Sequence, residues 1–110
     1  MRVRAFVRNA PVSPKKVRLI LDEVRGRRVD EALTILRFMA SPKARLVAKA
    51  VRSAAANAEN NYNMDVRRLR IVEAWAGDGI RFKRLNPRAR GRADILQKRR
   101  SNITIVVDEE

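Results

Sequence analysis

The chain has 110 residues, enough for one compact domain, and its 26 lysines and arginines against 12 acidic residues give a formal net charge of +14. It contains no cysteine and no histidine, which excludes disulfides, thiol chemistry, imidazole bases and histidine metal sites. The longest uncharged run, residues 101–107, is far too short to span a membrane. We therefore expect a soluble cytoplasmic protein without a metal or other cofactor.

The positive charge is concentrated in two patches. Residues 1–28 hold nine cations and two anions, and residues 81–100 hold nine cations and one anion, whereas the segment between them is nearly balanced. Arginines make up 20 of the 26 cations. Arginine is favoured where a planar donor group meets phosphate or stacks on a base. This pattern predicts a polyanionic partner, and the alternative is a solvated basic surface.

The first patch is expected to begin with a strand over residues 2–8. Apolar and basic residues alternate there, which is typical of a half-buried strand with one basic face. The inward set is Val3, Ala5 and Val7, and the outward set is Arg2, Arg4 and Arg8.

Ser13 and Pro14 are expected to start a helix that ends at Gly26. One apolar face at helical spacing is formed by Val17, Ile20, Leu21 and Val24. Cations in a first helical turn are unfavourable unless an anion binds there. We therefore interpret Lys15, Lys16 and Arg18 as phosphate contacts, the alternative being a solvated turn.

Two further helices are expected. The first is N-capped by Asp30, and its apolar stripe runs from Val29 to Met39 and includes Phe38. The second opens at Ser41-Pro42 and runs to about Asn60. Its packing face consists of small residues, namely Ala44, Val47, Ala48, Val51, Ala54, Ala55 and Ala58. A different face carries Arg45, Lys49 and Arg52, which either contact RNA or are solvated.

Two later segments, residues 66–76 and 102–107, are expected to be strands. Alternation within the first segment places Leu69, Ile71 and Trp75 on one face. With the N-terminal strand they give a three-stranded antiparallel sheet on which three helices pack, an α+β fold.

Residues 77–101 form a long connection with few large apolar residues, so they cannot build a core of their own. Because they leave and re-enter adjacent strands, we expect an extended basic β-hairpin that reaches roughly 40 Å from the body. An isolated ribbon of this kind is marginal in water, which indicates that it is ordered when surrounded by a folded polyanion. The alternative is a flexible basic loop.

Three blocks of sequence carry a resemblance to a known family. They are residues 13–18 (SPKKVR), residues 53–61 (SAAANAENN) and residues 87–93 (PRARGRA), the last followed by Lys98-Arg99. In order and spacing the chain resembles the bacterial form of the universal L-twenty-two family of large-subunit ribosomal proteins. Ile80 and Asn102 depart from that pattern, since the family often has proline and histidine at these positions.

The resemblance implies a single ribosomal-protein domain over residues 1–110 that binds large-subunit (23S) rRNA and supports subunit assembly. It implies that the hairpin tip lines the polypeptide exit tunnel through Pro87, Arg88, Ala89, Arg90, Gly91, Arg92 and Ala93. The implied partners are several domains of the rRNA, neighbouring ribosomal proteins and the nascent polypeptide, with no membrane.

The candidate RNA-binding cations come from both basic patches. They are Arg2, Arg4, Arg8, Lys15, Lys16, Arg18, Arg25, Arg27, Arg28, Arg81, Lys83, Arg84, Arg88, Arg90, Arg92, Lys98, Arg99 and Arg100.

Two other functions fit a basic protein of this size less well. A module for double-stranded DNA would need a base-reading row on an exposed helix, and no such row is apparent. A basic nuclease would need clustered carboxylates for metal ions, whereas the acidic residues are scattered. We therefore expect no enzymatic activity.

Overall fold

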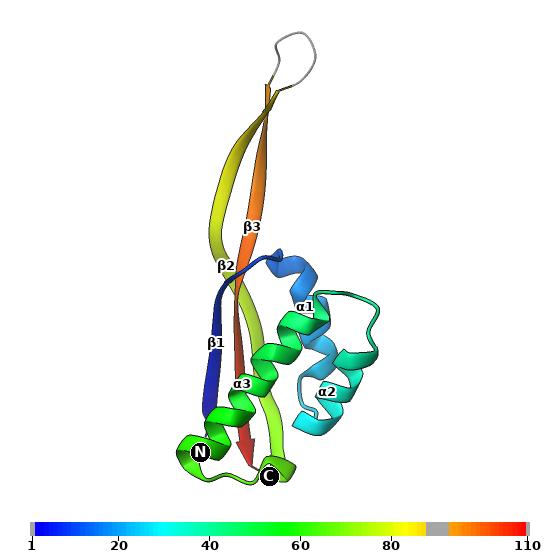
Figure 1. Ribbon diagram of the computed structural model, residues 1–110, viewed down its shortest axis with the longest axis vertical. Coiled ribbons are helices and arrows are strands. Elements are labelled where there is room, and N and C mark those ends of the chain that lie inside the picture. Colours follow the sequence, from blue (N-terminus) through cyan, green and yellow to red (C-terminus); the bar gives the residue numbers. More distant parts are fainter. Residues whose placement is uncertain (1, 88–92, 110) are drawn as a thin grey trace.

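The computed structural model describes the backbone of residues 2–87 and 93–109, and the side chains of residues 2–79 and 100–109. Its described elements form the expected α+β fold of three helices and a three-stranded sheet (Figure 1). In chain order they are β1 (Val3–Ala10), α1 (Pro14–Val24), α2 (Val29–Phe38), α3 (Ala44–Tyr62), the short 3-10 helix η1 (Val66–Arg68), β2 (Leu69–Pro87) and β3 (Ala93–Glu109).

The sheet is antiparallel with the order β1-β3-β2, so the last strand lies in the middle. Helix α3 lies across one face of β1 and β3, α1 packs against β2, and α2 packs on α3 (Figure 1). The central position of β3 explains its burial, because Ile103 and Ile105 are fully buried on the helical side and Thr104 is only 3% exposed on the other.

The helical core faces agree with the sequence expectation. In α1 the four expected residues Val17, Ile20, Leu21 and Val24 are buried, and all seven small residues of the α3 face are buried as well. Alanine and valine let the α3 backbone approach the sheet closely, which is why this helix occupies the centre of the body.

The starts of α2 and α3 differ from the prediction. Helix α2 starts at Val29 with Arg28 at the N-cap position, so the N-cap assignment of Asp30 was wrong; its carboxylate lies in the first turn. Phe38 was expected in the apolar stripe, but it ends the helix and is 80% exposed. Helix α3 starts at Ala44, because Ser41-Pro42 form a turn in which the Ala44 N–H donates to the Ser41 carbonyl.

Strand β2 also differs, and the cause is a β-bulge. Ile71 and Glu73 pair with consecutive residues of β3, which leaves Val72 as an extra residue. The bulge reverses the alternation beyond it. Trp75 is therefore 44% exposed on the opposite face from Leu69 and Ile71, and the expectation that the three share a face was wrong.

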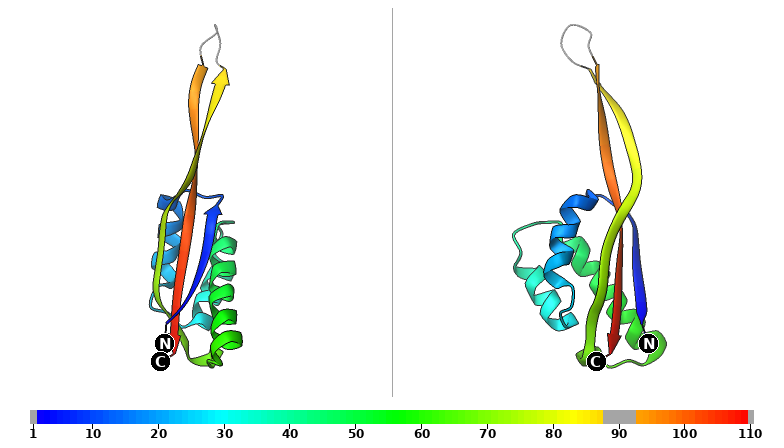
Figure 2. Two further views of the ribbon diagram at one scale, coloured as in Figure 1. Left: turned by 90° about the vertical axis from the view of Figure 1, so that its left-hand side faces the viewer. Right: turned by 180° about the vertical axis from the view of Figure 1, so that it is seen from behind.

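Strands β2 and β3 continue past the body as a two-stranded ribbon, the arm, whose outermost described pair is Pro87 with Ala93 (Figure 2). The molecule measures 62 × 26 × 17 Å, and the arm accounts for the long dimension. The protruding hairpin is thus confirmed. The expectation for Arg88, Ala89, Arg90, Gly91 and Arg92 at its tip lies outside the described residues.

Candidate nucleic-acid interface

The outer face of β1 carries the first group of candidate cations. Arg2, Arg4 and Arg8 are all exposed there, as the alternation predicted, while Val3 and Ala5 face the core. Arg2 Nη1 lies 3.1 Å from Glu73 Oε1 across the sheet, so part of its charge is balanced within the protein. Arg4 and Arg8 form no ion pair with any described residue.

A lysine cluster lies where α1 and α3 begin. Lys15 and Lys16 are exposed in the first turn of α1, and Lys43 at the N-cap of α3 lies beside Lys16. Desolvation, followed by the positive charge of Lys16, lowers the pKa of Lys43 below its ordinary value. Both helix N-termini add partial positive charge. A bound anion would relieve this repulsion, and the interpretation of Lys15 and Lys16 as phosphate contacts stays a prediction.

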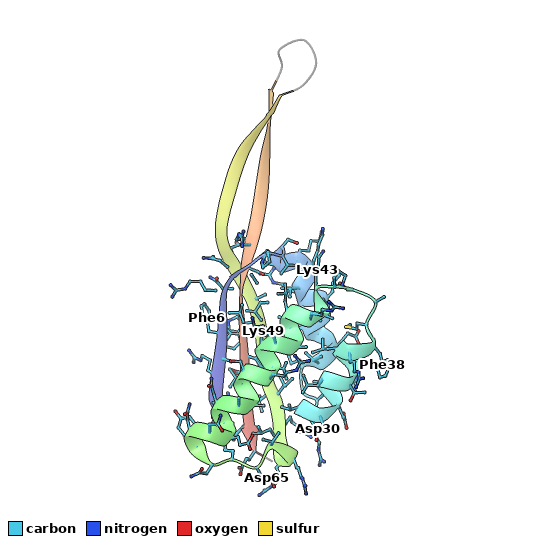
Figure 3. All side chains as sticks on the ribbon, viewed as in Figure 1. Phe6, Asp30, Phe38, Lys43, Lys49 and Asp65 are labelled. Carbon is cyan, nitrogen blue, oxygen red and sulfur yellow. The ribbon has the colours of Figure 1, made fainter. Side chains whose placement is uncertain are left out.

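The lysine cluster lies at the end of the body from which the arm projects. Figure 3 labels Lys43 there, whereas Asp30, near the start of α2, lies at the opposite end. Lys15 and Lys16 of the first basic patch therefore lie at the base of the arm that carries the second patch, although the two patches are far apart in the sequence. Arg27 and Arg28 directly precede α2, so they lie away from the lysine cluster.

Two candidate arginines make hydrogen bonds to the outer edge of β2. Arg18 donates from Nε and Nη2 to the Ala76 carbonyl at 3.1 and 2.9 Å. Arg25 donates from Nε and Nη2 to the Ala74 carbonyl at 3.1 and 2.6 Å, and its Nη1 lies 2.7 Å from Asp22 Oδ1. The sequence pattern did not predict these hydrogen bonds to β2, because they depend on where α1 packs. A role of these arginines in RNA binding stays a prediction.

Arg27 also has intramolecular partners. Its Nε donates to the Glu23 carbonyl at 2.8 Å, and its Nη1 lies 4.0 Å from Glu31 Oε2. Its backbone carbonyl accepts from the Ile71 N–H, and Arg28 forms a bridge with Arg70. The α1–α2 connection therefore acts mainly as an extra pairing partner for β2.

The base of the arm is joined to β1 by polar contacts. Arg100 Nη1 donates to the Asn9 carbonyl at 3.2 Å, and the Asn9 N–H donates to Asn102 Oδ1 at 2.9 Å. Asn102 Nδ2 donates to the Asp78 carbonyl at 3.3 Å, so the amide bridges all three strands. These contacts fix the direction in which the arm leaves the body.

The backbone register of the arm places one pair of like charges opposite each other, at Arg81 and Arg99. Arg81 pairs with Arg99, Lys83 with Gln97, and Arg84 with Leu96. Directly opposed like charges destabilise a strand pair in isolation. A polyanion around the arm would relieve the repulsion between Arg81 and Arg99, and the expected RNA contacts at Arg81, Lys83, Arg84, Lys98 and Arg99 stay a prediction.

A groove of about 580 Å³ lies between α2 and α3, and three arginines are among the residues that line it. Leu33, Leu36 and Met39 contribute to its lining, together with the basic residues Arg37, Arg45 and Arg52. The sequence pattern had singled out Arg45 and Arg52 but not Arg37, which comes from the other helix.

Among the side chains that the structure describes, no three carboxylates gather in a way that would hold a metal ion, so the nuclease alternative gains no support. In the same part of the chain, every helix is too short or too polar to cross a membrane.

Comparison with known proteins gives one consistent family. Residues 5–108 match the sequence model of the family described as Ribosomal protein L22p/L17e. The chain is similar to Large ribosomal subunit protein uL22 of Thermoanaerobacter sp. (strain X514), with 53% identity over 110 residues, which cover 100% of this chain and 99% of the relative. The uL22 protein of Clostridium novyi (strain NT) is 49% identical over 109 residues, which cover 99% and 98% of the two chains. That of Dehalococcoides mccartyi (strain BAV1) is 50% identical over 107 residues, which cover 97% and 98%.

Proposed function

The chain belongs to the ribosomal protein L22p/L17e family, and we propose that it acts by binding large-subunit (23S) rRNA and supporting assembly of the subunit. Membership of this family makes it a structural constituent of the large ribosomal subunit and not an enzyme. The observation that carries the RNA proposal is the meeting of the lysine cluster with the base of a protruding basic arm.

The proposed mechanism is electrostatic clamping. Lysines and arginines neutralise crowded phosphates and release counterions, which gives affinity that decreases steeply with salt concentration. The body contributes Lys15, Lys16 and the outer face of β1, and the arm contributes its paired basic strands. Structured RNA is recognised mainly through its shape and backbone, so a ribbon that inserts between RNA helices suits such a partner.

The arm extends this proposal to the exit tunnel. Its described strands reach as far as Pro87 and Ala93, far from the body (Figure 2). We assign the tip, from Pro87 to Ala93, to the tunnel wall, where it would meet the nascent polypeptide, and we assign the body to contacts with neighbouring ribosomal proteins. The support for both assignments is family membership together with the length of the arm.

The RNA proposal is tested by measuring affinity for large-subunit rRNA fragments over a range of salt concentrations. The wild-type protein should show a steep linear fall of log K with log salt, and Lys15→Gln/Lys16→Gln should reduce the slope by roughly 0.7–0.9 for each phosphate that is no longer neutralised. The matched control is Arg67→Gln/Arg68→Gln in η1, which removes the same charge at the other end of the body. A slope near zero for the wild-type protein would overturn the electrostatic mechanism.

The DNA-binding alternative is addressed by competition at one salt concentration. Folded rRNA should displace the protein from duplex DNA of equal length and concentration. A clear preference for the DNA would contradict the proposed function.

A further inference from the structure

The face of the sheet opposite α3 carries two exposed aromatic side chains in one row. Phe6 of β1 and Trp75 of β2 both pair with Thr104 of the central strand. Two strand spacings separate them, so their Cα atoms lie about 10 Å apart with the small Thr104 between. The right-hand view in Figure 2 looks onto this face, and the helices lie behind or beside the strands.

Both aromatic side chains are large apolar groups that the fold leaves accessible to solvent. Phe6 is 51% exposed and Trp75 is 44% exposed, whereas Thr104 beneath them is 3% exposed. Figure 3 shows Phe6 projecting outward from β1, away from α3. Burial of the two rings in the core would have stabilised the folded state more than their exposure to solvent does. The bulge at Val72 instead turns Trp75 outward, into the same row as Phe6.

The surroundings of the row are basic. Arg4 and Arg8 flank Phe6 on the outer face of β1 and are exposed. Arg2 lies on the same face, and its ion pair with Glu73 balances the acidic residue of the neighbouring row. Aromatic rings interleaved with arginines on an open sheet face combine a stacking surface for bases with donors for phosphates.

We propose that this aromatic face, formed by Phe6, Thr104 and Trp75 with Arg4 and Arg8, binds unpaired nucleotides of the RNA by stacking. The inference deepens the proposed function, on which it rests, by adding a base-binding surface to the phosphate-binding arm. Trp75 lies on β2 and Thr104 on β3, and both strands continue into the arm. RNA bound along the arm would therefore extend towards this face.

Charge decides between RNA and a protein as the occupant. An apolar protein surface would leave Arg4 and Arg8 beside it without partners, which is costly when charges are desolvated. Nucleotides satisfy both kinds of group at once, because the base covers the ring and the phosphate accepts from the guanidinium.

Trp75 is the only tryptophan of the chain, so its fluorescence reports directly on this face. The full-length protein is titrated with an oligouridine of about ten nucleotides and with an RNA duplex of the same length, while affinity is followed separately by anisotropy of labelled RNA. The single strand should quench Trp75 emission strongly, and the duplex should quench it less.

The variants separate stacking from general attraction. Phe6→Leu and Trp75→Leu should each weaken binding of the single strand by about five- to tenfold, and Trp75→Phe should retain most of the affinity because it keeps an aromatic ring. Phe38→Leu is the matched control, since Phe38 is an exposed aromatic on α2 away from the sheet. Circular dichroism spectra establish that the variants are folded.

Two failures can be told apart. RNA binding that leaves Trp75 emission and all variant affinities unchanged would overturn the aromatic face while the proposed function stands. Absence of RNA binding by the wild-type protein at low salt would instead overturn the proposed function. Shielding of Trp75 by a ribosomal protein but not by RNA would also overturn the inference.

Discussion

At the scale of single residues, Gly79 shows how tightly the arm is joined to the body. A Cβ atom at this position would lie 2.7 Å from Asn9 Oδ1 and 3.1 Å from the backbone carbonyl of Arg100. Gly77, two residues earlier on the same strand, has open space where its Cβ would lie. The two glycines thus offer a matched pair, because only one of them is required by a close approach.

We expect Gly79→Ala to lower the free energy of unfolding by about 1–3 kcal/mol, because the arm strands and Asn9 must move to accommodate the methyl group. Gly77→Ala should be close to neutral. Denaturant unfolding of both variants measures the difference. Equal stability of the two variants would contradict the close packing at the arm base.

Lys43 is a second residue whose environment matters. Its pKa is lowered by desolvation and by the neighbouring Lys16, which means that the folded state disfavours its charge. The resulting destabilisation is fully present below the folded pKa. It disappears as pH rises through the folded pKa towards the ordinary value of lysine.

Replacement of Lys43 by glutamine should therefore raise the melting temperature at neutral pH and low salt. The gain should shrink with added salt or phosphate, which screen or bind the lysines, and at pH above the lysine pKa. Thermal melting of Lys43→Gln is compared with that of Lys49→Gln, an exposed lysine further along α3. A gain that is identical for both variants would argue against a specific repulsion with Lys16.

At the scale of elements, the outer edge of β2 is protected where the strand runs through the body, over residues 70–76. The α1–α2 connection exchanges backbone hydrogen bonds with Ile71, and Arg18 and Arg25 donate to the carbonyl groups of Ala76 and Ala74. Exposed strand edges invite pairing with other chains. Helix α1 and its C-cap residue thus stabilise the sheet through basic side chains as well as through the apolar face of the helix.

Because Arg18 donates to the Ala76 carbonyl, Arg18→Gln should lower the free energy of unfolding by about 1–2 kcal/mol. This is the contribution of charge-assisted hydrogen bonds to a carbonyl group that is partly exposed to solvent. Lys15→Gln on the same helix should leave stability unchanged or slightly raised, because it removes a cation from the first helical turn, and should weaken rRNA binding instead. Denaturant unfolding and rRNA affinity of the two variants measure the contrast. A larger loss of RNA affinity than of stability for Arg18→Gln would place this arginine in the interface.

At the scale of the whole molecule, the body and the arm are distinct in construction. The buried core of the described residues comes from residues 3–76 and 101–107. The arm is a two-stranded ribbon beyond it, with a register that opposes Arg81 and Arg99. The body therefore has the contacts needed to fold alone, and we expect the arm to be ordered mainly by its partner.

Removal of residues 82–96 should leave a folded body. The deletion joins Arg81 to Gln97, so that Gln97 and Lys98 become a two-residue connection between the paired Arg81 and Arg99. Circular dichroism and thermal melting should show cooperative unfolding, together with a lower rRNA affinity and a shallower salt dependence.

A second deletion variant controls for poor turn formation. It adds Gln97→Asn/Lys98→Gly, which gives the connection an asparagine followed by a glycine, the pair that two-residue hairpin turns favour. Loss of cooperative unfolding in both deletion variants would make the arm part of the structural core.

The sequence by itself determined the features that depend on local order along the chain. The charge distribution located both basic patches, the 3.6-residue period identified the buried faces of α1 and α3, and the alternation of β1 placed Arg4 and Arg8 outside. The long basic connection indicated the arm. Each of these follows from the periodicity or composition of one segment, which neighbouring elements only reinforce.

Only the tertiary structure decided which groups from distant segments meet. The bulge at Val72, set by pairing with β3, turned Trp75 to the open face beside Phe6, and the packing of α1 committed Arg18 to the edge of β2. The approach of Lys16 and Lys43 likewise depends on how two helices come together. Strand register and helix packing are properties of pairs of segments, so no pattern within a single segment contains them.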